Sequence, residues 1–259
     1  MNLQSELDFI TDLAYRAGRL TLGYFNTGIR PDFKPDDTPV TAADRAAEEF
    51  IRREIEKTYP THAILGEEFG ESAPKSNSNH RWLIDPIDGT KSFMRGVPLF
   101  GVLIGLEIEG EVRVGAAYYP VLDEMLCAAD GLGCWWNGRR ARVSEVANLN
   151  QAYICFTNIR NMERCGRGAA WERLNQAAFA SRGWSDAYGY LLVATGRSEV
   201  MLDPIMNIWD CAPFSPIFRE AGGYFGDWQG NPGHIHKEAL ACNQHIFPEV
   251  MRMIEGVAA

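Results

Sequence analysis

The segment Asp85-Pro86-Ile87-Asp88-Gly89-Thr90, which follows the apolar run Trp82-Leu83-Ile84, constrains the fold more than any other part of the chain. It predicts a buried strand that ends in a turn, because its proline fixes φ and its glycine permits a positive φ. Residues three apart do not share a face of a straight strand, so the two aspartates converge only at such a turn. Convergent carboxylates repel each other unless a cation lies between them. Oxygen-only ligands favour magnesium or calcium over zinc. The alternative to a metal site is an ordinary Asp-Pro turn that ends the strand.

Three other acidic positions fit the same kind of site. Glu67 follows the apolar stretch Ala63-Ile64-Leu65 and so lies at another predicted strand end, although a solvated loop is the alternative. Asp44 stands three residues after Thr41, which is also the spacing of a helix capping box. Asp210 lies at the start of a predicted helix, where the helix macrodipole alone favours an acid. None of these three positions is specific when it is taken alone.

Hydrophobic periodicity predicts the helices and strands. Apolar residues at three- and four-residue spacing predict helices over 5–25, 41–58, 162–180, 186–195, 209–221 and a last helix ending near residue 256. Short apolar runs predict strands over 82–84, 99–108, 112–119, 124–128, 153–156, 200–203 and 240–242. Glu109-Gly110 predicts a hairpin turn, and Ser5 with Asp8 predicts a side-chain cap on the first helix. Residues 30–39 and 70–80 are expected to be loops, the second of them mobile.

These elements define two halves of different character. Residues 1–146 have the pattern of an α+β half, and residues 147–259 have the pattern of an α/β half. We expect the two halves to form one compact unit, with most of the candidate acids in the first half and Asp210 in the second.

Charge and composition exclude several classes of protein. The chain has 34 acidic and 25 basic residues, a net charge of −9, whereas nucleic-acid-binding proteins need a basic face. Residues 1–10 lack the basic region of a signal peptide, and the longest uncharged apolar run, 97–106, is about half of a membrane span. The six cysteines form no C-x-x-C pair and no zinc spacing, which predicts reduced and mostly buried thiols. We therefore expect a cytoplasmic protein with neither nucleic acid nor membrane as a partner.

Four ordered motifs together resemble the inositol monophosphatase family of magnesium-dependent, lithium-sensitive phosphomonoesterases. They are Val40-Thr41-Ala42-Ala43-Asp44, Gly66-Glu67-Glu68, Trp82 to Thr90, and Trp209-Asp210 leading to Glu220-Ala221-Gly222-Gly223. The resemblance covers nearly the whole chain. It implies the layered αβαβα sugar-phosphatase fold, usually as a homodimer, with two or three Mg²⁺ ions in each active site and a small phosphate ester as the substrate.

The resemblance also implies a set of metal ligands. A first ion is held by Glu67, Asp85 and the Ile87 carbonyl, and a second by Asp85, Asp88 and Asp210. Glu67 also helps to place a weaker third ion. The metals bind the phosphate and help to convert bound water into a hydroxide-like nucleophile.

Further resemblance-based roles concern the water and the phosphate. Thr90 and Asp44 orient the attacking water through a hydrogen bond between them and accept its proton, with Glu67 as the third catalytic residue. The backbone amides of Gly89 and Thr90, at the start of the next predicted helix, suit the phosphate oxygens. No covalent enzyme intermediate is expected, because no activated serine or cysteine lies near these motifs.

The substrate prediction depends on the residues that follow the turn. Gly89 to Pro98, GTKSFMRGVP, is more similar to the histidinol-phosphatase branch, which commonly has a lysine after Gly-Thr and an Arg-Gly-x-Pro continuation. Residues 182–188 also resemble the Gly-x-x-Asp-aromatic pattern of that branch, with Ala187 inserted. Histidinol phosphate carries an amine and an imidazole, so its pocket needs carboxylates outside the metal cluster. Asp186 and Asp203 are the candidates, and their structural alternatives are a helix cap and a strand-end turn. The predicted substrate contacts are Asp88, Gly89, Thr90, Asp186, Asp203 and Asp210.

The sequence therefore predicts a Mg²⁺-dependent phosphomonoesterase that releases phosphate from L-histidinol phosphate, a reaction of histidine biosynthesis. An inositol-1-phosphate phosphatase or a broader sugar-phosphate phosphatase is the alternative, because the same acids can bind hydroxyl groups. A noncatalytic protein that kept the fold is a third possibility. His234 and His236 have no acidic neighbour nearby, so we expect them to be partly exposed and not metal ligands. Lys91 and Arg95 flank the turn, where they could balance phosphate charge or face solvent.

Overall fold

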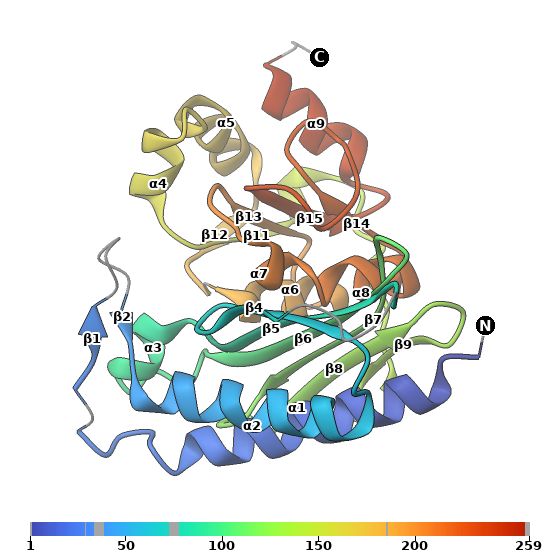
Figure 1. Ribbon diagram of the computed structural model, residues 1–259. Helices are drawn as coiled ribbons and strands as arrows, with labels where there is room; N and C mark the ends of the chain where they lie inside the picture. The colour runs from blue at the N-terminus through green and yellow to red at the C-terminus, as the bar shows by residue number, and fades with distance from the viewer. Residues whose placement is uncertain (1, 29, 34–38, 73–77, 185, 257–259) are drawn as a thin grey trace.

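The fold consists of five alternating layers of helices and sheets. The computed structural model describes residues 2–28, 30–33, 39–72, 78–184 and 186–256. Two helices cover one face of a large sheet, three helices separate this sheet from a second one, and three helices cover the far face (Figure 1). The predicted αβαβα architecture is confirmed.

The first sheet has eight strands in the order β10-β9-β8-β7-β6-β5-β3-β4. They are β3 (Ala63–Gly66), β4 (Gly70–Ser72), β5 (His80–Asp88), β6 (Gly101–Ile108), β7 (Glu111–Tyr119), β8 (Glu124–Ala129), β9 (Gly133–Trp136) and β10 (Arg139–Arg140). Only the β3–β5 pair is parallel among these described strands. The predicted hairpin at Glu109-Gly110 is confirmed, and the positive φ angles of 55° and 85° are those of a type I′ turn.

Helices α1 (Gln4–Leu22) and α2 (Ala42–Thr58) form the first layer. Leu7, Ile10 and Ala14 recur at helical spacing and are buried against the sheet. Strand β6 is buried along its whole length because helices cover both faces of the sheet. A two-stranded ribbon, β1 (Asp32–Phe33) with β2 (Pro39–Val40), and the short helix α3 (Thr90–Met94) lie at one end of this layer (Figure 1).

The second sheet has five strands in the order β12-β11-β13-β15-β14. They are β11 (Tyr153–Phe156), β12 (Ala180–Arg182), β13 (Val200–Asp203), β14 (Gly223–Gly226) and β15 (Ala239–Asn243), of which β11, β12 and β13 are mutually parallel. A 3₁₀ turn, Leu149–Gln151, leads into this sheet.

Two groups of helices flank the second sheet. Those between the sheets are α6 (Ala187–Ala194), α7 (Ile208–Cys211) and α8 (Phe214–Ala221), and those outside are α4 (Ile159–Arg164), α5 (Gly168–Ala177) and α9 (Phe247–Glu255). Helix α8 contacts β7, β8 and β9 on one side and β14 on the other. It therefore joins the two sheets.

Two predicted helices are each divided into two. The helix expected over 162–180 breaks after α4, where Gly166 has a φ of 71°, and its last residue begins β12. The helix expected over 209–221 is divided at Pro213, which has no N–H to donate to the preceding turn.

The predictions for the loops and for the first cap were partly wrong. Residues 32–33, 39–40 and 70–72 form short strands, and residues 34–38 and 73–77 of the same predicted loops lie outside the described residues. Ser5 does not cap α1: the Asn2 side chain accepts a hydrogen bond from the Gln4 N–H instead, and the Ser5 hydroxyl donates to Glu6. Short, polar edge strands carry too little apolar periodicity to be recognised.

Two properties of the whole chain are also visible. Every cysteine is a free thiol and only Cys165 is exposed, which confirms the prediction of unpaired, mostly buried cysteines. Among the described residues, each helix is too short or too polar to cross a membrane.

Candidate active site

The turn at the end of β5 brings two carboxylates to one side of the sheet. The pairing of β5 with β6 shifts between Asp85 and Asp88, which marks a bulge that turns the strand. The Ile87 N–H donates to Asp85 Oδ1 at 3.0 Å and so fixes the turn. Gly89 has a φ of 82°, a conformation that glycine adopts at no steric cost. The irregular end of β5 therefore allows the side chains of Asp85 and Asp88, three residues apart, to lie on the same side of the sheet.

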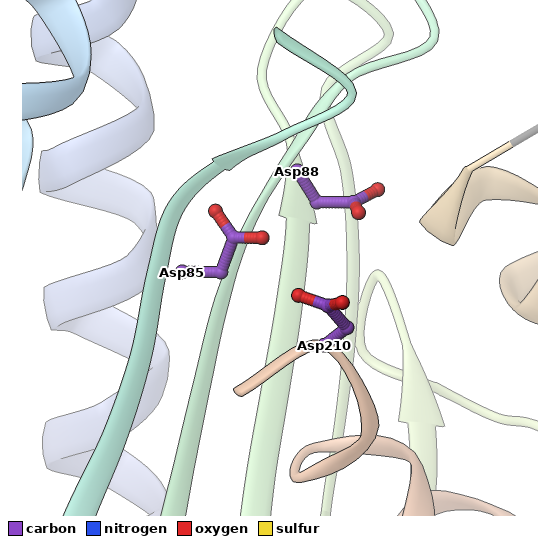
Figure 2. A group of neighbouring side chains, drawn as sticks. All are labelled: Asp85, Asp88 and Asp210. Carbon is purple, nitrogen blue, oxygen red and sulfur yellow. The ribbon is translucent and has the colours of Figure 1, made fainter. Parts of the chain in front are cut away.

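A third carboxylate comes from the second half of the chain. Asp210 lies in the first turn of α7, where its Oδ2 accepts a hydrogen bond from the Asn207 N–H at 2.8 Å. Asp85, Asp88 and Asp210 each offer an oxygen within 4.8 Å of the others, and the three carboxylates point toward one another (Figure 2). Residues more than 120 positions apart in the sequence thus build one oxygen-ligand cluster.

The cluster is electrostatically unfavourable without a cation. Burial, followed by the charges of Glu67 and Asp88, raises the pKa of Asp85 well above its usual value. Burial and the charge of Asp186 do the same to the pKa of Asp88. Burial and Glu67 raise the pKa of Asp210 to about 7. A divalent cation removes this repulsion, and an all-oxygen donor set fits Mg²⁺ or another hard cation.

The three carboxylates line a cleft of about 210 Å³. Its other walls include Glu67, Ile87, Lys91 and Asn207. Two larger hollows on the described surface contain no such carboxylate group. The chemistry therefore identifies the cleft as the candidate active site, although it is not the largest hollow.

Glu67 lies beside the carboxylate cluster but is not one of its three members. Its N–H donates to the Ile84 carbonyl at 3.1 Å, which holds it next to the end of β5. Its charge raises the pKa of Asp85, Asp44 and Asp210, yet its oxygens are outside the three-carboxylate group. Glu67 is thus positioned to join a larger cation site at the edge of the cluster.

Asp44 serves two purposes at the start of α2. Its Oδ2 accepts from the Thr41 N–H at 2.8 Å, which completes the capping box that the sequence offers as an alternative. Its Oδ1 accepts from the Thr90 hydroxyl at 3.4 Å, and the same hydroxyl lies 3.1 Å from the Ile87 carbonyl oxygen. Burial raises the pKa of Asp44. The structural and catalytic interpretations of Asp44 are therefore compatible, because each uses a different oxygen.

Asp186 lines the cleft from the second half of the chain. Its Oδ2 accepts a hydrogen bond from the Ser92 hydroxyl at 3.2 Å, and its φ is 56°. The side chain of Asp186 does not cap α6; Asp88 accepts from the Ala187 N–H instead, at 2.6 Å. The cap that the sequence offers as an alternative for Asp186 is thus supplied by Asp88, a member of the carboxylate cluster from the first sheet.

Asp203 is buried at the end of β13 and is not among the residues that line the cleft. Its Oδ1 accepts from the Ile205 N–H at 3.1 Å, as in a strand-end turn, and burial raises its pKa well above the usual value. The geometry therefore favours the structural alternative for Asp203.

The predicted partial exposure of His234 was wrong. His234 is buried, with its Nε2 3.1 Å from Glu107 Oε2, and Arg81 also pairs with Glu107. His236 lies 3.6 Å from Asp227. The acidic partner of His234 is 127 positions away in the sequence, so inspection of its neighbours could not find it.

Sequence reasoning missed three residues that hold the site together. Asn207 anchors Asp210, Ser92 anchors Asp186, and Glu48 accepts hydrogen bonds from the N–H groups of Glu68 and Phe69. The Asn207-x-x-Asp210 spacing is that of a capping box and is visible in the sequence. The other two contacts are long-range and leave no local pattern.

Lys91 and Arg95 differ in their positions. Lys91 lines the cleft and provides a positive charge there, whereas Arg95 lines a separate hollow beside α3.

Comparison with known proteins adds sequence and fold relationships. Residues 2–256 match the inositol monophosphatase family. The chain is 44% identical to a histidinol-phosphatase of Chlorobaculum parvum over 91% of this chain and 90% of that protein. It is 31% identical to an inositol-1-monophosphatase of Rhizobium meliloti over 96% of each protein. Among solved structures, the IMPase of Thermotoga maritima is 30% identical with a TM-score of 0.87, covering 98% of both chains.

Proposed function

This chain belongs to the inositol monophosphatase family and is a phosphoric monoester hydrolase, and we propose that it hydrolyses L-histidinol phosphate to L-histidinol and phosphate with Mg²⁺. The observation that carries the substrate proposal is the 44% identity to a protein named histidinol-phosphatase, against 31% to one named inositol-1-monophosphatase. Both similarities extend over at least nine-tenths of this chain. The proposed reaction places the protein in histidine biosynthesis.

Asp85, Asp88 and Asp210 are proposed to hold the cation, because their oxygens lie within 4.8 Å of one another and repel each other without it. Glu67 and the Ile87 carbonyl complete a site for two or three ions. When bound, Mg²⁺ supplies positive charge for the phosphate and lowers the pKa of a coordinated water molecule.

Thr90 and Asp44 are proposed to orient the attacking water and to accept its proton. The Thr90 hydroxyl already donates to Asp44 Oδ1, so the pair forms a path from the cleft to a buried carboxylate. Because burial raises the pKa of Asp44, its carboxylate is a stronger base than an exposed one. Thr41 holds the other oxygen of Asp44 and keeps the base in place.

The remaining residues that line the cleft are proposed to contact either the phosphate or the amine and imidazole of the substrate. The backbone amides of Gly89 and Thr90, with the cation of Lys91, suit the phosphate. The carboxylate of Asp186 stands outside the three-carboxylate group and suits the amine or imidazole of histidinol phosphate. Asp203, also predicted as a contact, is buried and does not line the cleft, so it is not assigned a direct contact with the substrate.

The test compares phosphate release from L-histidinol phosphate and from inositol-1-phosphate at equal concentration, with millimolar Mg²⁺. We expect kcat/KM to be at least about tenfold higher for the histidinol ester. Asp186→Asn is expected to reduce this preference by lowering kcat/KM for the histidinol ester more than for the inositol ester. A preference for inositol-1-phosphate would reject the substrate proposal but not the hydrolase assignment, and the inositol-1-monophosphatase relative makes it the second candidate.

Asp85→Asn tests the site itself. We expect it to abolish hydrolysis of both esters, and full activity in this variant would favour a noncatalytic role for the carboxylate cluster.

The homodimer and the cytoplasmic location are proposals based on the family resemblance and on composition. Light scattering of the purified chain tests the first, and fractionation of the source cells tests the second.

A further inference from the structure

A second hollow, separate from the active-site cleft, lies where the two halves of the chain meet. It has a volume of about 630 Å³, which is in the range of small-molecule sites. Its walls come from the start of β7, from α8, from β14 and from the start of α9. It shares no lining residue with the cleft that contains the carboxylate cluster.

Residues of opposite charge, Glu111 and Arg219, line this hollow. Arg219 Nη2 donates to the Val112 carbonyl at 2.8 Å, which places its guanidinium next to Glu111 along β7. Within the described part of the chain, the Glu111 carboxylate forms neither a hydrogen bond nor an ion pair, although its charge acts on His234. The wall thus offers an unpaired carboxylate beside a fixed guanidinium.

The guanidinium keeps its capacity to bind an anion. Asp130 pairs with Arg219 through both Nε at 3.0 Å and Nη2 at 2.9 Å, and it also accepts from Arg113 Nη1 at 3.0 Å. One carboxylate therefore serves two arginines, and one positive charge remains. Nη1 of Arg219 has no hydrogen-bond partner among the described residues. Because the other nitrogens are already held, little side-chain entropy is lost when an anion binds.

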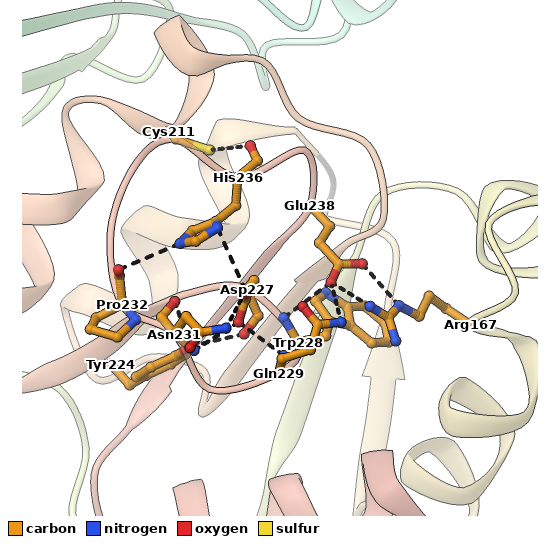
Figure 3. A network of polar contacts seen from close by, with 10 residues as sticks. All are labelled: Arg167, Cys211, Tyr224, Asp227, Trp228, Gln229, Asn231, Pro232, His236 and Glu238. Carbon is orange, nitrogen blue, oxygen red and sulfur yellow. Dashed lines mark hydrogen bonds and ion pairs between the residues drawn. The ribbon is translucent and has the colours of Figure 1, made fainter.

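Aromatic rings form the opposite wall. Tyr224 and Phe247 lie with ring centroids 4.3 Å apart, and both line the hollow. The Tyr224 hydroxyl donates to the backbone carbonyl oxygens of Asp227 and Asn231, within the polar network of Figure 3. The ring is therefore held in place by its hydroxyl, and it lines the hollow.

Ser215 completes the polar lining. It is a buried residue of α8 that lines the hollow, and its hydroxyl has no hydrogen-bond partner among the described residues. The hydroxyl is not one of the buried polar atoms that lack a partner, so it is accessible from the hollow and can bond to a ligand atom there.

We propose that this hollow binds a small aromatic zwitterion, such as a free α-amino acid with a planar ring. The carboxylate of the ligand pairs with Arg219, its ammonium group with Glu111, and its ring packs against Tyr224 and Phe247. The Ser215 hydroxyl is placed to supply a further hydrogen bond. This arrangement uses each unsatisfied group of the wall and requires no change in the fold.

Calorimetric titration of the full chain with L-phenylalanine near neutral pH tests the proposal. We expect saturable binding below roughly 10 mM. Three analogues each lack one recognised group: 2-phenylethylamine lacks the carboxylate, 3-phenylpropionate lacks the ammonium group, and L-alanine lacks the ring. Each is expected to bind at least about fivefold more weakly, the loss typical of one partly exposed ion pair or ring contact.

A matched pair of variants locates the site. Glu111→Gln is expected to weaken L-phenylalanine binding about fivefold. Glu109→Gln removes the same charge from the same hairpin but outside the hollow, and is expected to leave binding unchanged. Absence of saturable binding, equal affinity for all four compounds, equal affinity of the two variants, or competition by Mg²⁺ with inorganic phosphate would each overturn the proposal.

Discussion

Asp210→Asn is expected to stabilise the metal-free protein while it abolishes activity. In the absence of a cation, the Asp210 carboxylate lies within 4.8 Å of the oxygens of Asp85 and Asp88 and close to Glu67, which together with burial raises its pKa from 3.8 to about 7. The amide of asparagine removes the charge but keeps an oxygen that can accept from the Asn207 N–H. The substitution therefore removes repulsion without removing the helix cap.

The sign and size of the effect follow from the shift in pKa. The pKa of Asp210 is higher in the folded protein than in the unfolded chain, so its carboxylate destabilises the fold at pH values where the unfolded chain would ionise it. Stability is highest below about pH 4 and is lost as the pH rises to about 7. Three pKa units correspond to about 4 kcal/mol at most. Because Asp210 is partly exposed and water screens its charge, the expected gain for the variant is about 1–3 kcal/mol near pH 8, and less than half of that near pH 5.

Thermal unfolding with EDTA measures this gain. An increase of 1–3 kcal/mol corresponds to a rise in Tm of roughly 3–10 °C for a chain of this size. With millimolar Mg²⁺ the order should reverse, because the wild-type protein gains binding free energy that the variant has lost. Asp8→Asn, on the exposed face of α1, is the matched control and should leave Tm unchanged. If Asp210→Asn melts at or below the wild-type temperature in EDTA near pH 8, repulsion in the cluster is not the dominant force.

Three further predictions concern catalysis and packing. Thr90→Val should lower kcat by about 10²–10⁴-fold with little effect on Tm, whereas Thr90→Ser should retain most of the activity. Equal activity of the two variants would exclude a role for the hydroxyl. Gly115→Ala should destabilise the protein by about 1–3 kcal/mol in denaturant titrations, because its Cβ would lie 2.3 Å from the Pro213 carbonyl oxygen, and unchanged stability would show that α8 can move away. His234→Ala should lower the free energy of unfolding by about 1–3 kcal/mol, because buried Glu107 then loses one of its partners, while kcat at saturating Mg²⁺ stays constant. A loss of kcat without a loss of stability would contradict this structural role.

Local sequence patterns predicted the part of the site that is local. The Asp85 to Thr90 segment holds both its carboxylates and the proline and glycine that shape its turn, so its chemistry and its backbone can be read together. The Glu109-Gly110 hairpin was predictable for the same reason, because turn residues stand directly between two apolar runs. The membership of Asp210 in the cluster rested on family resemblance, since a contact across more than 120 residues of sequence leaves no local pattern.

Contacts between distant segments could not be predicted. The cap of α6 comes from Asp88, 99 positions before the Ala187 N–H that it accepts from, and not from the neighbouring Asp186. His234 pairs with Glu107 across 127 positions. In each case the side chain satisfies a need created by tertiary packing, and for the α6 cap the neighbouring Asp186 was available to mislead a local interpretation.

The division of the carboxylate cluster between the two halves has a consequence for synthesis of the chain. Asp85 and Asp88 leave the ribosome well before Asp210, and the cap that Asp88 provides at Ala187 forms only after the second sheet has begun. A growing chain therefore carries two acids with incomplete coordination until its last quarter has emerged. A prematurely terminated product that stops before α7 would lack the third carboxylate of the proposed cation site.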